Sequence, residues 1–207
     1  RMPPILKALK ERSLRGRTPV EGLRRTECAY HGWDTVHADA ASWEPFAPGD
    51  AFGGLEAHHC FKGTVTLPEA SAGKRVVCLV STGASDIWNN NNPQFLAYVD
   101  GRLVCGLDVN HNEFDLAACA VPGESHELAL YVYCNTPARD VFLRVETAER
   151  DDDVTGLYYD LRAPYEVCAL LADDDTRAIG IMKHLNRALN LLDLRDLDSG
   201  AFAQSVR

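Results

Sequence analysis

Hydrophobic positions alternate with polar ones through the middle of the chain. The alternation has a period of two over residues 61–67, 128–134 and 141–147. Such a period places successive side chains on opposite faces of a strand, so we expect each segment to bury one face and expose the other. The continuous apolar run at residues 75–80 predicts a more central strand. Several short antiparallel strands joined by turn-rich loops indicate a β-sandwich or jelly roll.

The strongest local signal is a hairpin. Residues 95–99 and 102–105 are two strand-forming runs, and Asp100-Gly101 lies between them. Asp-Gly supplies the positive φ angles of a two-residue turn whose twist matches the flanking strands. The sequence therefore predicts two antiparallel strands joined at this dipeptide.

Helical patterns occupy both ends of the chain. Apolar residues at near-helical spacing in residues 5–14, followed by Gly16 and Pro19, predict one or two short helices, and the basic stretch 7–25 reads as the solvated face of a helix. Residues 173–176 supply an N-cap and an acidic first turn for a later helix. Its apolar stripe consists of Ile181, Met182, Leu185, Ala188, Leu189 and Leu192. Either the sandwich or a further part of a longer polypeptide is expected to cover this stripe, and residues 199–207 are expected to open another helix.

These patterns divide the chain into three zones. Residues 1–28 are a helical lead-in, residues 29–150 form a β-sandwich accessory domain, and residues 151–207 form a helical linker. The fold class is mainly β: an antiparallel sandwich of the jelly-roll, galactose-binding-like kind, with short N-terminal helices and a C-terminal helical segment.

Composition narrows the function classes. The 207 residues carry a formal net charge of −9, which disfavours binding to nucleic acid or to anionic membranes. No apolar run approaches the roughly 20 residues that span a bilayer. The seven cysteines are an odd number without zinc-knuckle spacing, and most lie among apolar neighbours. We expect reduced thiols in the cytoplasm, with a disulfide or a reactive thiol as the alternative.

Candidate chemistry gathers in the loop at residues 106–113. Asp108, Asn110, His111 and Glu113 place hydrogen-bonding groups close together, as a sugar site requires. The aromatic side chains available for stacking are Trp88, Trp43 and Tyr98. In the alternative interpretation Asp108 and Asn110 cap turns, while His111 bridges loops or a neighbouring domain. A calcium site built from these oxygens is a third, weaker alternative.

Two adjacent histidines, His58 and His59, are further candidates. Neighbouring residues on a strand point to opposite faces, so we expect one to be packed and the other exposed, and we do not expect a shared metal ion. Gly53-Gly54 indicates a loop or bulge. The sequence contains no nucleophile elbow, zinc-protease, phosphate-loop or dinucleotide motif, and sequence alone pairs no two carboxylates as a catalytic acid and base.

Four segments carry a resemblance to a known family. They are Phe52-Gly53-Gly54 followed by His58 and Phe61, then Trp88 with residues 92–101, then residues 106–113, and finally residues 157–161 followed by the helix. Together they resemble the N-terminal region of α-mannosidases of glycoside hydrolase family 38, in particular the bacterial and cytosolic branch. The sequence departs from that pattern at Ala57, Cys60 and Cys105.

The resemblance implies a non-catalytic front domain. In that family the zinc ion and the nucleophilic aspartate of a retaining mechanism belong to a following domain, so the resemblance implies no cofactor and no catalytic residue before Arg207. The expected partners are the enzyme's own catalytic domain and further copies of the full-length enzyme, and the expected role is inter-domain packing, shaping of the cleft and oligomerisation. A free-standing lectin-like module that binds glycan itself is the alternative.

Overall fold

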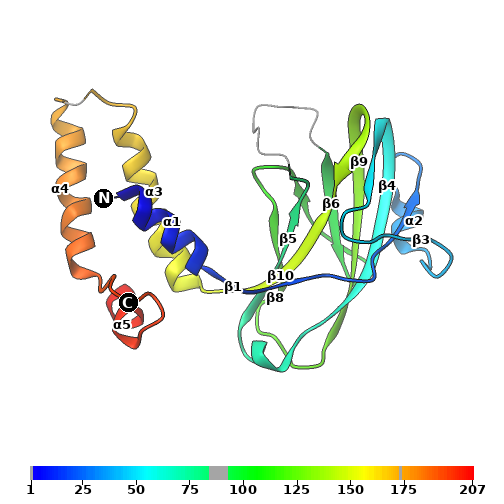
Figure 1. Cartoon of the computed structure of the whole chain (residues 1–207), viewed down its shortest axis with the longest axis horizontal. Helices are drawn as coiled ribbons and strands as arrows, with labels where there is room; N and C mark the ends of the chain where they lie inside the picture. The colour runs from blue at the N-terminus through cyan, green and yellow to red at the C-terminus, as the bar shows by residue number, and fades with distance from the viewer. Residues whose placement is uncertain (1, 84–92, 173) are drawn as a thin grey trace. The chain divides into compact units, whose positions relative to one another are not determined.

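The computed structural model describes residues 2–83, 93–172 and 174–207. It divides into two compact units, one formed by residues up to Arg15 together with Arg150–Arg207 and the other by Gly16–Glu149. The elements in chain order (Figure 1) are α1 (Met2–Arg12), β1 (Leu14–Pro19), β2 (Arg24–Glu27), α2 (Trp33–His37), β3 (Glu44–Pro45), β4 (Ala51–Thr66), a 3-10 turn (Glu69–Ser71), β5 (Arg75–Ser81), β6 (Gln94–Val99), β7 (Arg102–Leu107), β8 (Glu113–Ala117), β9 (Ser125–Phe142), β10 (Arg144–Arg150), α3 (Asp152–Cys168), α4 (Thr176–Leu191) and α5 (Gly200–Val206).

The β unit is an antiparallel sandwich, which confirms the predicted fold class. One sheet has the strand order β1-β10-β5-β8 and the other the order β3-β2-β4-β9-β6-β7. The long strands β4 and β9 pair antiparallel from Ala51 with Phe142 to Thr66 with Ser125. The facing sides of the two sheets form the main hydrophobic core. Its members on β9 are the four alternating residues expected from the sequence, Leu128, Leu130, Val132 and Cys134.

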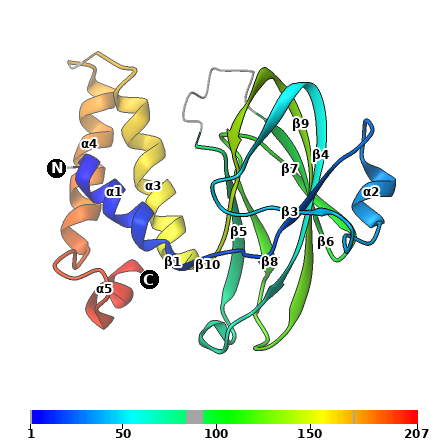
Figure 2. The same cartoon turned by 45° about the vertical axis from the view of Figure 1, so that its right-hand side comes forward.

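The outer face of the six-stranded sheet is partly covered by the segment that contains α2. Figure 2 shows this helix on the side of the sheet turned away from the four-stranded sheet. Val36 and Trp43 from the covering segment pack there against Cys60, Tyr98 and Tyr131 of the sheet, and these contacts form a second cluster of buried side chains. The six-stranded sheet is therefore apolar on both faces over part of its area.

The hairpin between β6 and β7 has the predicted turn. Val99 pairs with Arg102, and Asp100 and Gly101 have φ angles of 51° and 73°. The carboxylate of Asp100 accepts hydrogen bonds from the backbone N–H of Glu127 and from Nδ1 of His126, each at 2.8 Å. These bonds, with that to His126 as the largest cause, lower the pKa of Asp100 below its ordinary value of 3.8.

The helical unit has a core of its own. Met2 and Leu9 of α1 pack with Tyr158 of α3, Leu189 of α4 and Phe202 of α5. Helices of this chain thus cover the apolar stripe of α4, which corrects the expectation that the sandwich or a further part of a longer polypeptide does so. Helix α1 belongs to the same unit as the C-terminal helices. Among the described helices, none is both long and apolar enough to cross a membrane.

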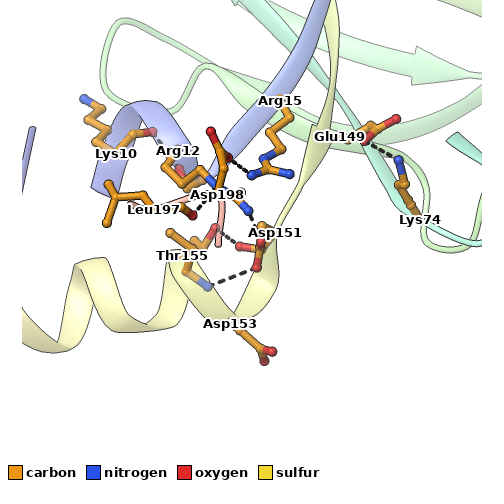
Figure 3. A network of polar contacts seen from close by, with 12 residues as sticks. Lys10, Arg12, Arg15, Lys74, Glu149, Asp151, Asp153, Thr155, Leu197 and Asp198 are labelled. Atoms are coloured by element: carbon orange, nitrogen blue, oxygen red, sulfur yellow. Dashed lines mark hydrogen bonds and ion pairs between the residues drawn. The ribbon is translucent and has the colours of Figure 1, made fainter. Parts of the chain in front are cut away.

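Arg12 ties three parts of the helical unit together (Figure 3). Its guanidinium lies 3.2 Å from the carboxylate of Asp151 and 3.0 Å from that of Asp198, and its Nε donates to the carbonyl of Leu197 at 3.0 Å. Asp151 is also the N-cap of α3, where its side chain accepts the backbone N–H of Val154. Because the Arg12 side chain is 14% exposed, these contacts are only partly screened by water.

Two sequence predictions need correction. The helical lead-in over residues 1–28 is helical only to Arg12, since β1 and β2 follow it. Five of the six residues of β1 are exposed, so this edge strand carries no alternating pattern that could mark it. The strand predicted over residues 141–147 is two strands that break at Leu143, because β9 and β10 belong to different sheets.

Replacing Asp151 with Ala is expected to lower the free energy of unfolding of the helical unit by about 1–2 kcal/mol, since it removes an N-cap and an ion-pair partner of Arg12. Urea unfolding followed by the helical circular-dichroism signal measures this. The control is Asp174→Ala, which removes an exposed carboxylate. Equal stability of the two variants would contradict the role given to Asp151.

Replacing Asp100 with Asn is expected to keep the turn, since Asn tolerates a positive φ, but to lose the charged acceptor. A lowered folded-state pKa stabilises the protein above the unfolded-state pKa, and this stabilisation is lost as the pH falls through the folded value. The variant should therefore be less stable than the wild type at neutral pH, and the difference should close below pH 3.8. Urea midpoints across the pH range test this, with Asp34→Asn as the exposed control.

Candidate functional site

An open pocket of about 750 Å³ lies on the part of the outer face that α2 leaves uncovered. Its volume falls in the range of small-molecule sites. The residues that line it come from β4, β6, β7, β9 and the loops beside them. They are Tyr30, His31, Glu56, His58, Gln94, Phe95, Leu96, Gly106, Leu107, Asp108, Tyr131 and Tyr133.

Strand register brings the polar side chains of the pocket into one row. His58 of β4 pairs with Tyr133 of β9, and Tyr133 pairs on its other side with Gln94 of β6. Their sequence neighbours His59 and Val132 point to the opposite face and are buried, because side chains alternate along a strand. The expectation of one packed and one exposed histidine is met only for the packed one: His59 is buried, while His58 is half-buried and lines the pocket.

His58 and Tyr131 form the centre of the site. Nδ1 of His58 lies 2.7 Å from the hydroxyl oxygen of Tyr131, which also accepts the backbone N–H of His31 at 3.2 Å. The His58 ring is nearly parallel to that of Tyr131, with 15° between the planes, and its centroid lies 5.2 Å from that of Tyr133. Burial raises the pKa of Tyr131 above its ordinary value.

A tight turn at residues 28–32 supplies one wall of the pocket. The backbone N–H of Cys28 donates to the carbonyl of His58 at 3.0 Å, and that of Gly32 donates to Ala29 at 3.0 Å. His31 and Gly32 have φ angles of 69° and 55°, a conformation that favours glycine. A Cβ at Gly32 would lie 2.4 Å from the ring of Tyr131, so glycine also permits the close approach of this turn to the sheet.

A bulge in β4 brings the side chain of Glu56 to the pocket. The register with β9 shifts between Phe52 and Gly54 and again between Leu55 and Ala57, and Glu56 has a φ of 50°. Bulges of this kind redirect a side chain relative to the regular strand. Gly53-Gly54 thus marks a bulge, which is one of the two readings its sequence allowed.

Of the four polar candidates in the loop at residues 106–113, one lines the pocket. Asp108 lines the pocket, and its Oδ1 accepts the backbone N–H groups of Asn110 at 2.8 Å and His111 at 2.7 Å. These bonds, the one from His111 first, lower the pKa of Asp108. Asn110 and His111 are exposed outside the pocket, and Glu113 begins β8 in the other sheet. The turn-capping interpretation of Asp108 is therefore the one that the geometry matches.

The remaining sequence candidates lie elsewhere. Trp43 and Tyr98 are buried in the cluster beneath α2, so the expectation that they are available for stacking is wrong. Trp88 lies outside the described residues. Tyr30 and Tyr133 provide the accessible aromatic surface instead, whereas Tyr131 lines the pocket but is buried in the same cluster as Trp43 and Tyr98. Sequence reasoning missed Tyr131 and Tyr133 because they alternate with the apolar core positions of β9 and so lie on the face expected to be polar. Within residues 2–83, 93–172 and 174–207, no three His, Cys, Asp or Glu side chains are grouped as metal ligands.

The charge of the pocket narrows what it can bind. Its ionisable side chains include the carboxylates of Glu56 and Asp108 and the imidazoles of His31 and His58. Among the described residues that line it, none is lysine or arginine, the residues that hold phosphates and carboxylates. Hydroxyl, amide, imidazole and carboxylate groups together bind the hydroxyls of a neutral ligand.

Among known proteins, the chain is similar to several solved structures. No protein-family model matches the sequence, and no curated protein does so. The chain is similar to the crystal structure of a β-glucuronidase from Bacteroides uniformis, with a TM-score of 0.48 and 11% identity over 65% of this chain and 18% of that one. It is similar also to a β-glucuronidase from Ruminococcus gnavus in complex with D-glucuronic acid, with a TM-score of 0.48 and 8% identity over 65% of this chain and 29% of that one.

The chain thus spans less than a third of the length of these β-glucuronidases. A TM-score below 0.5 at such identity establishes neither a shared function nor a shared substrate. The architecture described above and the chemistry of the pocket therefore carry the functional argument.

Replacing Gly32 with Ala is expected to destabilise the β unit by about 2–4 kcal/mol, because the methyl group meets the Tyr131 ring in addition to the strain of a positive φ. Gly22→Ala is the matched control, since Gly22 has a φ of 69° and open space around its Cβ position. Urea unfolding followed by tyrosine fluorescence compares them. Equal losses in the two variants would show that the turn does not press on Tyr131.

Proposed function

We propose that this chain is a non-catalytic β-sandwich module of a glycoside hydrolase of the α-mannosidase type, and that its outer-face pocket binds a neutral sugar residue of a glycan. The observation that carries the binding role is the pocket itself, with the row of His58, Tyr133 and Gln94 across three adjacent strands. The mannosidase assignment rests on the sequence resemblance at residues 52–61, 92–101 and 106–113.

The composition of the pocket supports a sugar as its ligand. A pyranose offers hydroxyl groups around its edge and an apolar C–H face, so it needs planar hydrogen-bonding groups beside aromatic carbon. Gln94, His58 and Asp108 supply the first, and Tyr30 and Tyr133 supply the second. Tyr30, at 70% exposure, is the most open of these rings, and it lies edge-on to His58 with 5.7 Å between centroids.

The helical unit supports a role in a larger assembly. Leu170, Leu191 and Ile179 expose 86%, 80% and 56% of their surface, although the unit has a complete core. Exposed apolar side chains of this size are typical of surfaces that meet another domain or another copy. In this proposal the zinc ion and the nucleophile of the hydrolase belong to another domain. The seven free thiols support a reducing compartment such as the cytoplasm.

Calorimetric titration of the chain with an α-linked mannobiose tests the binding role. We expect binding, and we expect His58→Ala to weaken it about tenfold. The substitution removes one hydrogen-bonding group from the pocket and also the hydrogen bond that positions the hydroxyl of Tyr131. His111→Ala is the control, since this exposed imidazole lies outside the pocket.

Three outcomes would contradict the proposal in different ways. Absence of heat with mannobiose and with other neutral disaccharides removes the binding role and leaves a packing role for the module. Loss of binding in His111→Ala but not in His58→Ala moves the site to the loop at residues 106–113. Tighter binding of a quaternary ammonium compound than of any sugar identifies the pocket as a cation site built on the tyrosines and carboxylates.

A further inference from the structure

Two cysteines lie in contact beneath the wall of the pocket. The sulfur atoms of Cys28 and Cys60 are 3.4 Å apart. Cys60 lies in β4, and its antiparallel partner in β2 is Thr26. Cys28 stands two residues farther along, where its backbone N–H continues the ladder to His58, so the two side chains are diagonal neighbours on one face of the sheet.

The two thiols differ in environment. Cys60 is fully buried, whereas Cys28 is partly exposed at the end of the strand. The S–H of Cys60 points to the sulfur of Cys28, and this hydrogen bond lowers the pKa of Cys28 and raises that of Cys60. Cys28 is therefore the thiol that ionises first and attacks an oxidant, and Cys60 is placed to resolve the product.

The other cysteines lack this combination. Cys78 and Cys134 lie in the main core, where burial raises their pKa values to about 12 and about 11. Burial also raises the pKa of Cys105. Cys119 is exposed. The contact between two sulfur atoms, together with the burial of only one of them, is what distinguishes Cys28 and Cys60.

We propose that Cys28 and Cys60 are a reversible disulfide pair that ties the turn at residues 28–32 to β4. With a small-molecule disulfide as oxidant, the Cys28 thiolate attacks one sulfur and releases one small thiol, leaving a mixed disulfide on Cys28. The sulfur of Cys60 then attacks that of Cys28 and releases the second small thiol. The two protein thiols lose two electrons and two protons, and the oxidant gains them as two thiols.

Closing the bond needs the sulfur atoms to approach from 3.4 Å to about 2.05 Å. The disulfide would restrict the motion of the turn that carries Tyr30 and His31. Formation of the disulfide is independent of what the pocket binds. Any effect of the disulfide on ligand affinity rests on the proposed function. The test therefore measures formation of the disulfide and the hydrogen exchange of the turn, and it uses no ligand.

The chain is incubated with oxidised glutathione and then with dithiothreitol, and the cysteine peptides are identified by mass spectrometry after alkylation. We expect a Cys28–Cys60 disulfide that dithiothreitol reverses, and slower amide hydrogen exchange at residues 29–32 in the oxidised protein. In the reduced protein, Cys28 should react with iodoacetamide at least about tenfold faster than Cys105.

Variants separate the pair from a general thiol effect. Cys119→Ser removes an exposed thiol and should leave the disulfide intact, whereas Cys28→Ser should abolish it and leave Cys60 unreactive. Cys60→Ala, which fills the buried position with an apolar side chain, should leave Cys28 as a stable mixed disulfide with glutathione. Full alkylation of both cysteines after oxidation, or unchanged exchange at residues 29–32 once the bond has formed, would overturn the proposal.

Discussion

The pairing of β4 with β9 is the constraint on which the rest of the sandwich depends. Because side chains alternate along a strand, a slip of one residue would exchange the two faces of the sheet over its whole length. In the observed register Phe61 pairs with Leu130, and both lie in the core between the sheets. The same register carries His58 and Tyr133 to the outer face. Core and pocket are thus two results of one ladder.

The outer face of the six-stranded sheet has two different areas, one closed by apolar packing and one that carries the pocket. Under α2 it is closed by packing, and even Lys62 is buried there, because its ammonium reaches the carbonyl of Ala38 at 2.8 Å and the carboxylate of Glu127 at 3.0 Å. Beyond the covering segment the same strands present Tyr133 and His58. The turn at residues 28–32 separates the two areas, and it also carries the thiol that we propose as redox-active.

Comparison of particular elements shows where sequence reasoning was sufficient. The Asp100-Gly101 hairpin, the buried alternation in β9 and the N-cap of α4 at Asp175 follow local rules of backbone geometry, periodicity and capping, and they are found as expected. The acidic first turn expected for α4 is wrong, because the helix begins only at Thr176. The edge strand β1 was missed because exposed positions carry no periodic signal. Trp43 and Tyr98 were misjudged as free platforms because a short helix that no pattern marked, α2, buries them.

The sequence by itself determined that the chain is a mainly β, acidic protein with helical ends, since period, turn chemistry and charge are properties of neighbouring residues. It also pointed to Asp108 and His58 as candidate site residues. Only the tertiary structure decided that these two share a pocket with three tyrosines, that α1 belongs with the C-terminal helices, and that Cys28 touches Cys60. Those contacts join residues that are far apart along the chain. They are fixed by strand register and by the packing of one covering segment, which no local pattern encodes.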